Sequence, residues 1–332
     1  MDYIKRWVAG ALLSVMAGHA AYAGDIVVAV PNPSAILLLP IVAAQGEGYF
    51  AEEGVNVSIE ALNGSGAVIQ ALASGQAQIG NPGAGPLLQA RTRGVEITNV
   101  YRLNPLSSFA IVVPEGSGIA SAEGLRGKTI GVGTADGSET AFARSILNEA
   151  GLQEGTDYTF LVVGDGGQAA AGFLRGDIDA YAAATNDAAI LNARGVKLEN
   201  ITPEKYKTFF GNALAAMSSY LEANRKDVEG FGRALVKGAK WAADPANREA
   251  LLAHIGAENP QEVEDKEFAN ALINQIIIRQ TPFDPAKGYG YQSHEAWVAW
   301  QDSLVASGEL KMPLDDLSAV YTNDFIDIWN GK

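Results

Sequence analysis

Residues 45–85 read QGEGYFAEEGVNVSIEALNGSGAVIQALASGQAQIGNPGAG and predict the order helix, strand, helix, strand. Gly54 and Gly75 mark the two helix ends, because glycine takes the left-handed conformation that closes a helix without a Cβ clash. Between residues 55 and 59, apolar and polar residues alternate, which indicates a strand with one buried face. We therefore expect an α/β protein.

Two short polar turns follow the predicted strands of this stretch, residues 63–66 (NGSG) and residues 81–83 (NPG). Each turn leads into another predicted helix. Open α/β sheets bind small molecules in the crevice at the carboxyl ends of their strands. The two turns are therefore candidate ligand contacts.

The first 23 residues have the pattern of a secretory signal peptide. Lys5 and Arg6 precede an apolar run over residues 7–18, and the small residues that follow fit cleavage after Ala23. The apolar run is shorter than the roughly 20 residues that a membrane span needs. We expect an exported protein that is not inserted in the membrane.

Composition narrows the compartment and the partners. The chain of 332 residues has no cysteine and a formal net charge of −14. The absence of cysteine excludes disulfides, thiolate metal sites and a cysteine-linked lipid anchor. An acidic surface argues against nucleic acid and anionic membranes as partners. We therefore expect a freely diffusing periplasmic protein.

The strand and helix pattern starts again near residue 109. Residues 171–180 (AGFLRGDIDA) repeat the helix end, glycine and short strand of residues 71–80 (ALASGQAQIG). The chain is also longer than one hydrophobic core usually holds. We therefore expect two lobes built on one plan.

The sequence of the last third of the chain predicts helices that pack in the core rather than a binding or catalytic site. Amphipathic spacing predicts helices near 219–243, 247–255, 262–278, 291–307 and 314–330. Trp297 and Trp300 share one helical face, which favours core packing over ligand contact. His254 and His294 lie outside the strand-end turns, so we predict no catalytic or metal role for either.

Four segments carry a family resemblance: residues 48–57 (GYFAEEGVNV), 71–80, 125–132 (LRGKTIGV) and 176–181 (GDIDAY). In this order they resemble the periplasmic solute-binding proteins of ABC importers. The resemblance is to the branch that contains the alkanesulfonate- and taurine-binding proteins and the thiamine-pyrimidine-precursor proteins. It covers most of the first two-thirds of the chain.

The resemblance implies a type 2 periplasmic-binding fold, with two α/β lobes that are each a mixed sheet flanked by helices. Two crossover strands, near residues 109–114 and 209–216, would form the hinge. Lobe I would comprise residues 24–111 and 212–332, and lobe II residues 112–211. A ligand in the cleft would then favour the closed state over the open one.

The resemblance also implies the function, which is capture of a small organic solute for an ABC permease and its ATPase. The expected protein is a monomer with no cofactor, no metal and no catalytic residue. On this fold the strand-end turns line the cleft. The candidate ligand-binding residues are Ser34, Ser65, Asn81, Tyr101, Arg102, Thr134, Ser138, Asp165, Gln168, Asn186 and Asp187.

Several of these turns precede helices, whose free N–H groups and positive dipole ends favour an anionic head group. Ser65 and Ser138 are explained equally well as caps of their own helices. Arg102, the basic side chain of these turns, could pair with a sulfonate or carboxylate, or form a surface salt bridge. Tyr101 could offer an aromatic face to a ring or pack in the core.

The acidic candidates all fall in lobe II. Asp136 with Glu139, and Asp165 with Gln168, have the spacing of a capping box, which favours a structural role. Asp187 has no such explanation, and in the cleft it would meet an amine or another hydrogen-bond donor.

The ligand is expected to be a sulfonate or taurine-like compound, with alternatives. Many taurine-binding relatives have tryptophan and proline after the last lobe II strand, whereas residues 183–187 read AATND here. An amino-sulfonate, a pyrimidine or thiamine precursor, or an aromatic carboxylate therefore stays an alternative.

Two further functions compete with import. Residues 131–137 (GVGTADG) resemble a dinucleotide fingerprint, but the third glycine is one residue late and the acidic strand end is missing. Thiamine-pyrimidine synthases share the implied fold but rely on a cysteine-rich motif and histidine chemistry, so we do not expect an enzyme. A ligand-sensing module that docks on a receptor stays an alternative to import.

Overall fold

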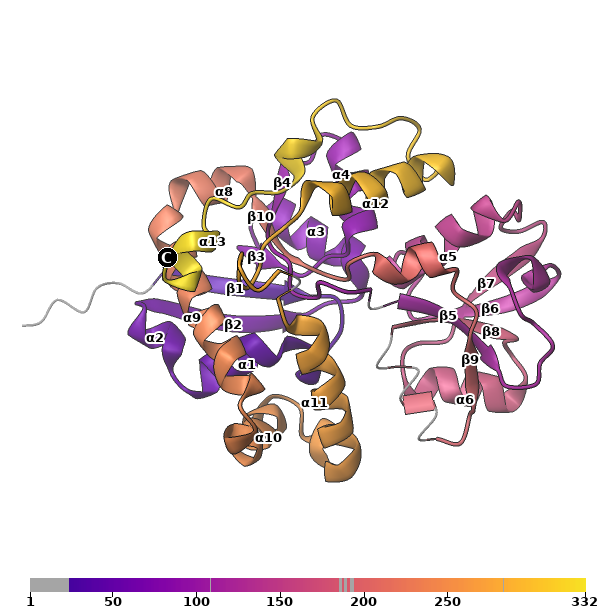
Figure 1. Cartoon of the computed structure of the whole chain (residues 1–332), viewed down its shortest axis with the longest axis horizontal. Helices are drawn as coiled ribbons and strands as arrows, with labels where there is room; N and C mark the ends of the chain where they lie inside the picture. The colour runs from indigo at the N-terminus through magenta and orange to yellow at the C-terminus, as the bar shows by residue number, and fades with distance from the viewer. Residues whose placement is uncertain (1–23, 108, 185–186, 188–189, 192–193, 283) are drawn as a thin grey trace, which may run out of the picture.

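The computed structural model describes residues 24–107, 109–184, 187, 190–191, 194–282 and 284–332. It contains two five-stranded sheets, each flanked by helices, in two lobes that lie side by side (Figure 1). This is the two-lobed α/β architecture that the sequence predicts. Asn186, one of the candidate ligand-binding residues, lies outside the described residues.

The first sheet has the strand order β2-β1-β3-β10-β4. β1 is parallel to β2 and β3, whereas β10 is antiparallel to β3 and β4. Val55 and Val57 are buried and Asn56 and Ser58 are exposed, as the alternation predicts. The strands are β1 (Gly24–Val30), β2 (Val55–Ala61), β3 (Ile79–Gly80), β4 (Ile97–Tyr101) and β10 (Leu214–Met217).

The second sheet repeats this plan with the order β7-β6-β8-β5-β9. β6 is parallel to β7 and β8, and β5 is antiparallel to β8 and β9. β5 pairs with β8 from Phe109 onward, so the lobe boundary expected at residue 111 falls inside a strand of this sheet. The strands are β5 (Phe109–Pro114), β6 (Lys128–Val132), β7 (Tyr158–Val162), β8 (Ala180–Ala184) and β9 (Leu198–Asn200).

We call the elements packed on the first sheet lobe I and those packed on the second sheet lobe II. The helices between residues 39 and 92 are α1 (Leu39–Gly46), α2 (Tyr49–Glu52), α3 (Gly64–Ser74) and α4 (Ala84–Thr92). Lobe II contains α5 (Ser138–Glu149) and α6 (Gly167–Arg175). The later helices are α8 (Ser218–Ala223), α9 (Arg225–Ala243), α10 (Arg248–Glu258), α11 (Lys266–Gln280), α12 (His294–Ala306) and α13 (Ile326–Asn330).

The long helix predicted over residues 314–330 is wrong. The segment forms a short 3-10 turn, η6 (Leu317–Val320), and then α13. Between them Tyr321 is extended and bridges to Asn99, and the Thr322 N–H donates to the Asn99 carbonyl at 2.9 Å. Pairing with the edge of the first sheet therefore replaces helical hydrogen bonds at this point.

α12 packs on α4 of lobe I and on α5 of lobe II. Trp297 and Trp300 on this helix are 0% and 1% exposed, as expected of core residues. The Trp300 ring lies 6.4 Å from Phe142 of α5 and 4.9 Å from Phe209, which precedes β10. An aromatic cluster therefore fills the junction of the two lobes.

Candidate ligand-binding site

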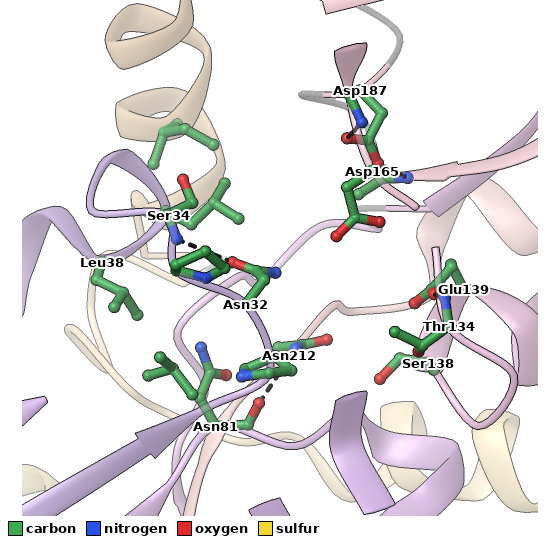
Figure 2. A pocket seen from close by; sticks show the side chains of 18 of the residues that line it. Asn32, Ser34, Leu38, Asn81, Thr134, Ser138, Glu139, Asp165, Asp187 and Asn212 are labelled. Atoms are coloured by element: carbon green, nitrogen blue, oxygen red, sulfur yellow. Dashed lines mark hydrogen bonds between the residues drawn. The ribbon is translucent and has the colours of Figure 1, made fainter. Parts of the chain in front are cut away.

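A cavity of about 370 Å³ lies where the carboxyl ends of strands from the two sheets face each other (Figure 2). Its lining includes Asn32 after β1, Asn81 after β3, Thr134 after β6, Asp165 after β7 and Asp187 after β8. This volume is in the range of small-molecule sites. The cavity occupies the place at which open α/β sheets bind ligands.

The lobe I side of the cavity presents side-chain amides and a hydroxyl. The Asn212 amide Nδ2 donates to the Asn81 carbonyl at 3.1 Å, which fixes the orientation of that amide. The Oδ1 atoms of Asn81 and Asn212 are buried and have no hydrogen-bond partner among the described residues. The Ser34 hydroxyl donates to the Glu262 carboxylate. Lobe I therefore offers unused acceptors to a ligand that carries donors.

Three carboxyl groups line the lobe II side, and we call Glu139, Asp165 and Asp187 the acidic wall (Figure 2). Asp187 is 3% exposed and accepts hydrogen bonds from the N–H groups of Gly166 at 3.1 Å and Ala184 at 3.0 Å. A Glu139 carboxylate oxygen lies 3.3 Å from the Thr134 nitrogen, which donates to it. The acidic wall is thus held by the backbone turns that follow β6, β7 and β8.

Burial raises the pKa of every member of the acidic wall. The pKa of Glu139 is raised to about 7, mainly by burial and further by the charges of Asp165 and Asp136, against the hydrogen bonds of the Glu139 and Thr134 backbone. Burial also raises the pKa of Asp187 well above its usual range, and Asp165 and Glu139 add to the shift. Burial raises the pKa of Asp165, which the Tyr181 hydroxyl lowers in part. A cationic group in the cavity would favour the ionised forms.

The two lobes touch at the cavity through two serines. The Ser65 hydroxyl in α3 lies 2.7 Å from the Ser138 hydroxyl in α5, and the Gly83 N–H donates to Ser65 Oγ at 3.2 Å. A Cβ on Gly83 would overlap the Ser138 side chain, and a Cβ on Gly66 would overlap the Asp136 carboxylate. Glycine in these two turns therefore lets the lobes approach this closely.

The structure brings seven of the candidate residues to this cavity, which are Ser34, Ser65, Asn81, Thr134, Ser138, Asp165 and Asp187. The N-cap residue is Asn63 in α3 and Gly137 in α5, and neither helix has a side-chain hydrogen bond at its N-cap. Capping is therefore not the role of Ser65 or Ser138 in this structure. The expected capping box of Asp136 is absent as well, because Glu139 binds the Thr134 N–H.

Tyr101, Arg102 and Gln168 are not among the residues that line the cavity. Tyr101 ends β4, is 2% exposed and packs with its ring 6.0 Å from Trp329. Gln168 is exposed on α6, and its N–H donates to the Asp165 carbonyl at 3.0 Å. The side chains of Tyr101 and Gln168 therefore lie outside the cavity.

Arg102 is buried at the junction of the lobes, neither in the cavity nor on the surface. Its Nη2 donates to the Pro105 carbonyl at 2.7 Å, and its guanidinium carbon lies 4.6 Å from the centre of the Phe210 ring. Burial lowers the pKa of Arg102 to about 10. The expectation that it faces an anionic ligand is corrected, because its backbone pairs with Gly290 and its side chain lies against the Phe210 ring.

The cavity residues that were missed from the sequence include Asn32, Asn212, Glu139 and Arg279. Glu139 follows the predicted turn directly, so the signal was present but was interpreted as helix capping. Arg279 lies on α11, on the same face as Leu272 and Ile276, which also line the cavity. A charge within the buried face of a helix is the signal that could have identified it.

Within the described part of the chain, no group of three or more His, Asp or Glu side chains could hold a metal ion. His254 pairs with Glu47 at 2.8 Å, and His294 lies 3.1 Å from the Tyr321 hydroxyl. None of the described helices is long and apolar enough to cross a membrane.

The chain is similar to curated proteins of different function. It is 26% identical over 308 residues to the riboflavin-binding protein RibY of Chloroflexus aurantiacus, over 90% of this chain and 84% of that protein. It is also 26% identical over 308 residues to the 4-amino-5-hydroxymethyl-2-methylpyrimidine phosphate synthase of Uromyces fabae, over 87% of this chain and 83% of that enzyme.

The fold is that of known periplasmic binding proteins. The alkanesulfonate-binding protein SsuA from Xanthomonas axonopodis pv. citri, solved with MOPS bound, superimposes with a TM-score of 0.68 at 18% identity, over 91% of this chain and 99% of that one. The family model described as NMT1/THI5 like matches residues 37–248. This segment is more than half of the chain, so the protein belongs to the NMT1/THI5-like family.

Proposed function

We propose that this protein is the solute-binding component of an ABC importer. In this proposal it captures a small organic compound in the cavity between its lobes and delivers it to a membrane permease driven by an ATPase. The observation that carries the proposal is the cavity itself, which is lined by strand-end turns of both sheets. A ligand that contacts both lobes stabilises the closed form selectively, and this difference is what a permease can recognise.

The proposal includes the compartment and the oligomeric state. The protein would be exported through its N-terminal signal peptide, be cleaved after Ala23 and act as a monomer in the periplasm. In this proposal the hinge lies where the chain passes between the sheets, just before β5 and just before β10. These stretches adjoin the crossovers that the sequence predicts near residues 109–114 and 209–216. A micromolar ligand would correspond to a total binding free energy of about −8 kcal/mol.

The sulfonate or taurine-like ligand is one proposal among several. The acidic wall favours a ligand with an ammonium or several donors over a simple alkanesulfonate, because carboxylates without a cationic partner repel anions. An amino-sulfonate, a pyrimidine or thiamine precursor, or an aromatic carboxylate with donors meets this requirement. The names of the two curated relatives add riboflavin and a pyrimidine phosphate to the compounds worth testing.

Binding to the purified protein, without residues 1–23, tests the proposal. Alkanesulfonates, amino acids, aromatic carboxylates, pyrimidines and riboflavin are screened by thermal shift, because a compound that binds only the native state raises the melting temperature. We expect one class to raise it and to reduce the radius of gyration in small-angle X-ray scattering. No shift with any class would contradict the proposal.

A synthase activity is the second candidate, since one relative carries that name. The chain has no cysteine, and no histidine is found among the described residues that line the cavity. Both facts favour binding over that chemistry. Mass spectrometry of a bound compound after long incubation separates the two, because a binding protein returns its ligand unchanged.

A ligand-sensing module is the third candidate, and it would use the same closure. A permease and an ATPase encoded next to this gene would favour import. A neighbouring sensor kinase without a permease would favour sensing.

A further inference from the structure

Arg279 is a buried cation on the lobe I side of the cavity. It is 9% exposed, and it is the one basic side chain among the described residues that line the cavity. It takes part in none of the hydrogen bonds or ion pairs of the described residues. Burial lowers its pKa to about 10, and no carboxylate contributes an opposing shift.

The acidic side chain that lobe I contributes to the cavity lining is engaged elsewhere. Glu262 lines the same cavity, but its carboxylate accepts from the Ser34 hydroxyl and, at 3.0 Å, from the Ile36 N–H. An unpaired buried charge is costly unless a partner arrives. A buried guanidinium that lines a cavity without an ion-pair partner is suited to bind an anionic group of the ligand. It can bind such a group with two hydrogen bonds.

The opposite lobe presents the complementary chemistry. The acidic wall of lobe II offers carboxyl oxygens. On the lobe I side, the buried Oδ1 atoms of Asn81 and Asn212 are further acceptors without partners in the described chain. Asn81 is 5% exposed, so its free acceptor belongs to the cavity and not to the surface. Leu38, Leu272 and Ile276 add an apolar part to the lining.

We propose that the cavity selects bifunctional ligands, in which an anionic group binds Arg279 of lobe I and a separate ammonium or donor-rich group binds the acidic wall of lobe II. The inference deepens the proposed solute-binding function and rests on it. Because the two charged groups belong to different lobes, a ligand with both ends gains from closure. A compound with one charged end contacts one lobe and gives little difference between the open and closed states.

The test compares compounds matched in length, at constant pH and ionic strength. The bifunctional set comprises ω-amino carboxylates, ω-amino alkanesulfonates and an aminopyrimidine carboxylate. The singly charged set comprises the corresponding alkyl carboxylates, alkanesulfonates and alkylamines. We expect a bifunctional compound to raise the melting temperature and to reduce the radius of gyration, and its singly charged counterparts to bind at least tenfold more weakly.

Variants assign the two ends of the ligand. Arg279→Met should reduce the affinity for the bifunctional compound at least tenfold without lowering the melting temperature of the empty protein, since it removes an unpaired buried charge. Asp165→Asn with Glu139→Gln should weaken binding of the same compound and strengthen any residual binding of the alkanesulfonate, because the variant removes carboxylates that repel an anion. Lys266→Met, an equal charge change at an exposed position of α11, is the control and should change neither quantity.

The outcomes distinguish this inference from the proposed function. The inference is overturned if a singly charged or uncharged compound binds with equal affinity, or if Arg279→Met binds the bifunctional compound with unchanged affinity. Neither result contradicts the proposed solute-binding function. If no compound of this panel or of the wider screen binds, both proposals fail. Loss of stability in Arg279→Met would assign the residue a structural role and would also overturn the inference.

Discussion

The hydroxyl groups of Ser65 and Ser138 lie 2.7 Å apart and join the first turn of α3 in lobe I to the first turn of α5 in lobe II. Both serines are almost fully buried, at 1% and 4% exposure. Ser65 belongs to lobe I and Ser138 to lobe II, so this contact joins the two lobes at the cavity. Separation of the lobes would break it, so we expect it only in the closed state.

Gly83→Ala should prevent this closure. Gly83 has a φ of −78°, which alanine adopts freely, so the open form is not strained. In the closed form the new methyl group would overlap the side chain of Ser138. We expect at least a tenfold loss of ligand affinity, about 1.4 kcal/mol or more, measured by calorimetry.

Gly85→Ala is the matched control for this change. Its Cβ would meet the nearest neighbour, Ala141 Cβ, at 3.5 Å, which is an ordinary contact. Scattering should show ligand-induced compaction in the control and none in Gly83→Ala. Normal compaction of Gly83→Ala would contradict the role given to this contact.

Glu139→Gln should change how stability depends on pH. The pKa of Glu139 is raised to about 7 in the folded protein, against its ordinary value of 4.5, so folding favours the protonated form. That stability is fully present below about pH 4.5 and is lost as pH rises through about 7. The variant should therefore be more stable than the wild type at pH 8, with little difference at pH 4.5.

Melting temperatures of the empty protein between pH 4.5 and pH 8 measure this effect. The pKa values of Asp165 and Asp187 are raised as well, so the variant keeps a residual dependence of stability on pH. An identical pH profile for Glu139→Gln and wild type would show that folding does not raise the pKa of Glu139.

Arg102→Met should weaken the junction of the lobes rather than ligand selectivity. The change removes the hydrogen bond to the Pro105 carbonyl and the contact with the Phe210 ring. A hydrogen bond from a charged group contributes about 1.5 to 3 kcal/mol, and urea unfolding should show a loss of that order. Loss of anion binding at unchanged stability would instead restore Arg102 as a ligand contact.

Asp187→Ala should destabilise lobe II. The carboxylate accepts from the N–H groups of Gly166 and Ala184, and the substitution leaves both donors without this partner. A buried donor without a partner costs about 1 to 3 kcal/mol. Urea unfolding measures the loss, and Asp177→Ala, at an exposed position of the same lobe, should cost much less.

The fold could be predicted from local patterns because each lobe repeats one arrangement. The glycines at helix ends and the alternation at residues 55–59 identify strands and helices without reference to the rest of the molecule. The segment after residue 314 could not be predicted in this way. Its structure depends on pairing with Asn99, more than 200 residues earlier in the chain.

Site residues could be predicted from the sequence where they directly follow a strand. Asn81, Thr134 and Asp187 each follow a strand, and parallel strands bring such turns together. Arg102 also follows a strand, but its bridge to Gly290 turns it away from the cavity. Arg279 comes from a helix of the last third, and only the tertiary structure brings it to the strand ends.

The strand order has a consequence for biosynthesis. β10 lies between β3 and β4 in the first sheet, yet it follows all of lobe II along the chain. A growing polypeptide can therefore complete the second sheet first. β4 can join the first sheet only after β10, which lies between β3 and β4, has been synthesised. Arg279 and α12 emerge later still. The proposed ligand site is therefore complete only when synthesis is nearly finished, and an incomplete chain would lack the residues that we propose bind the solute.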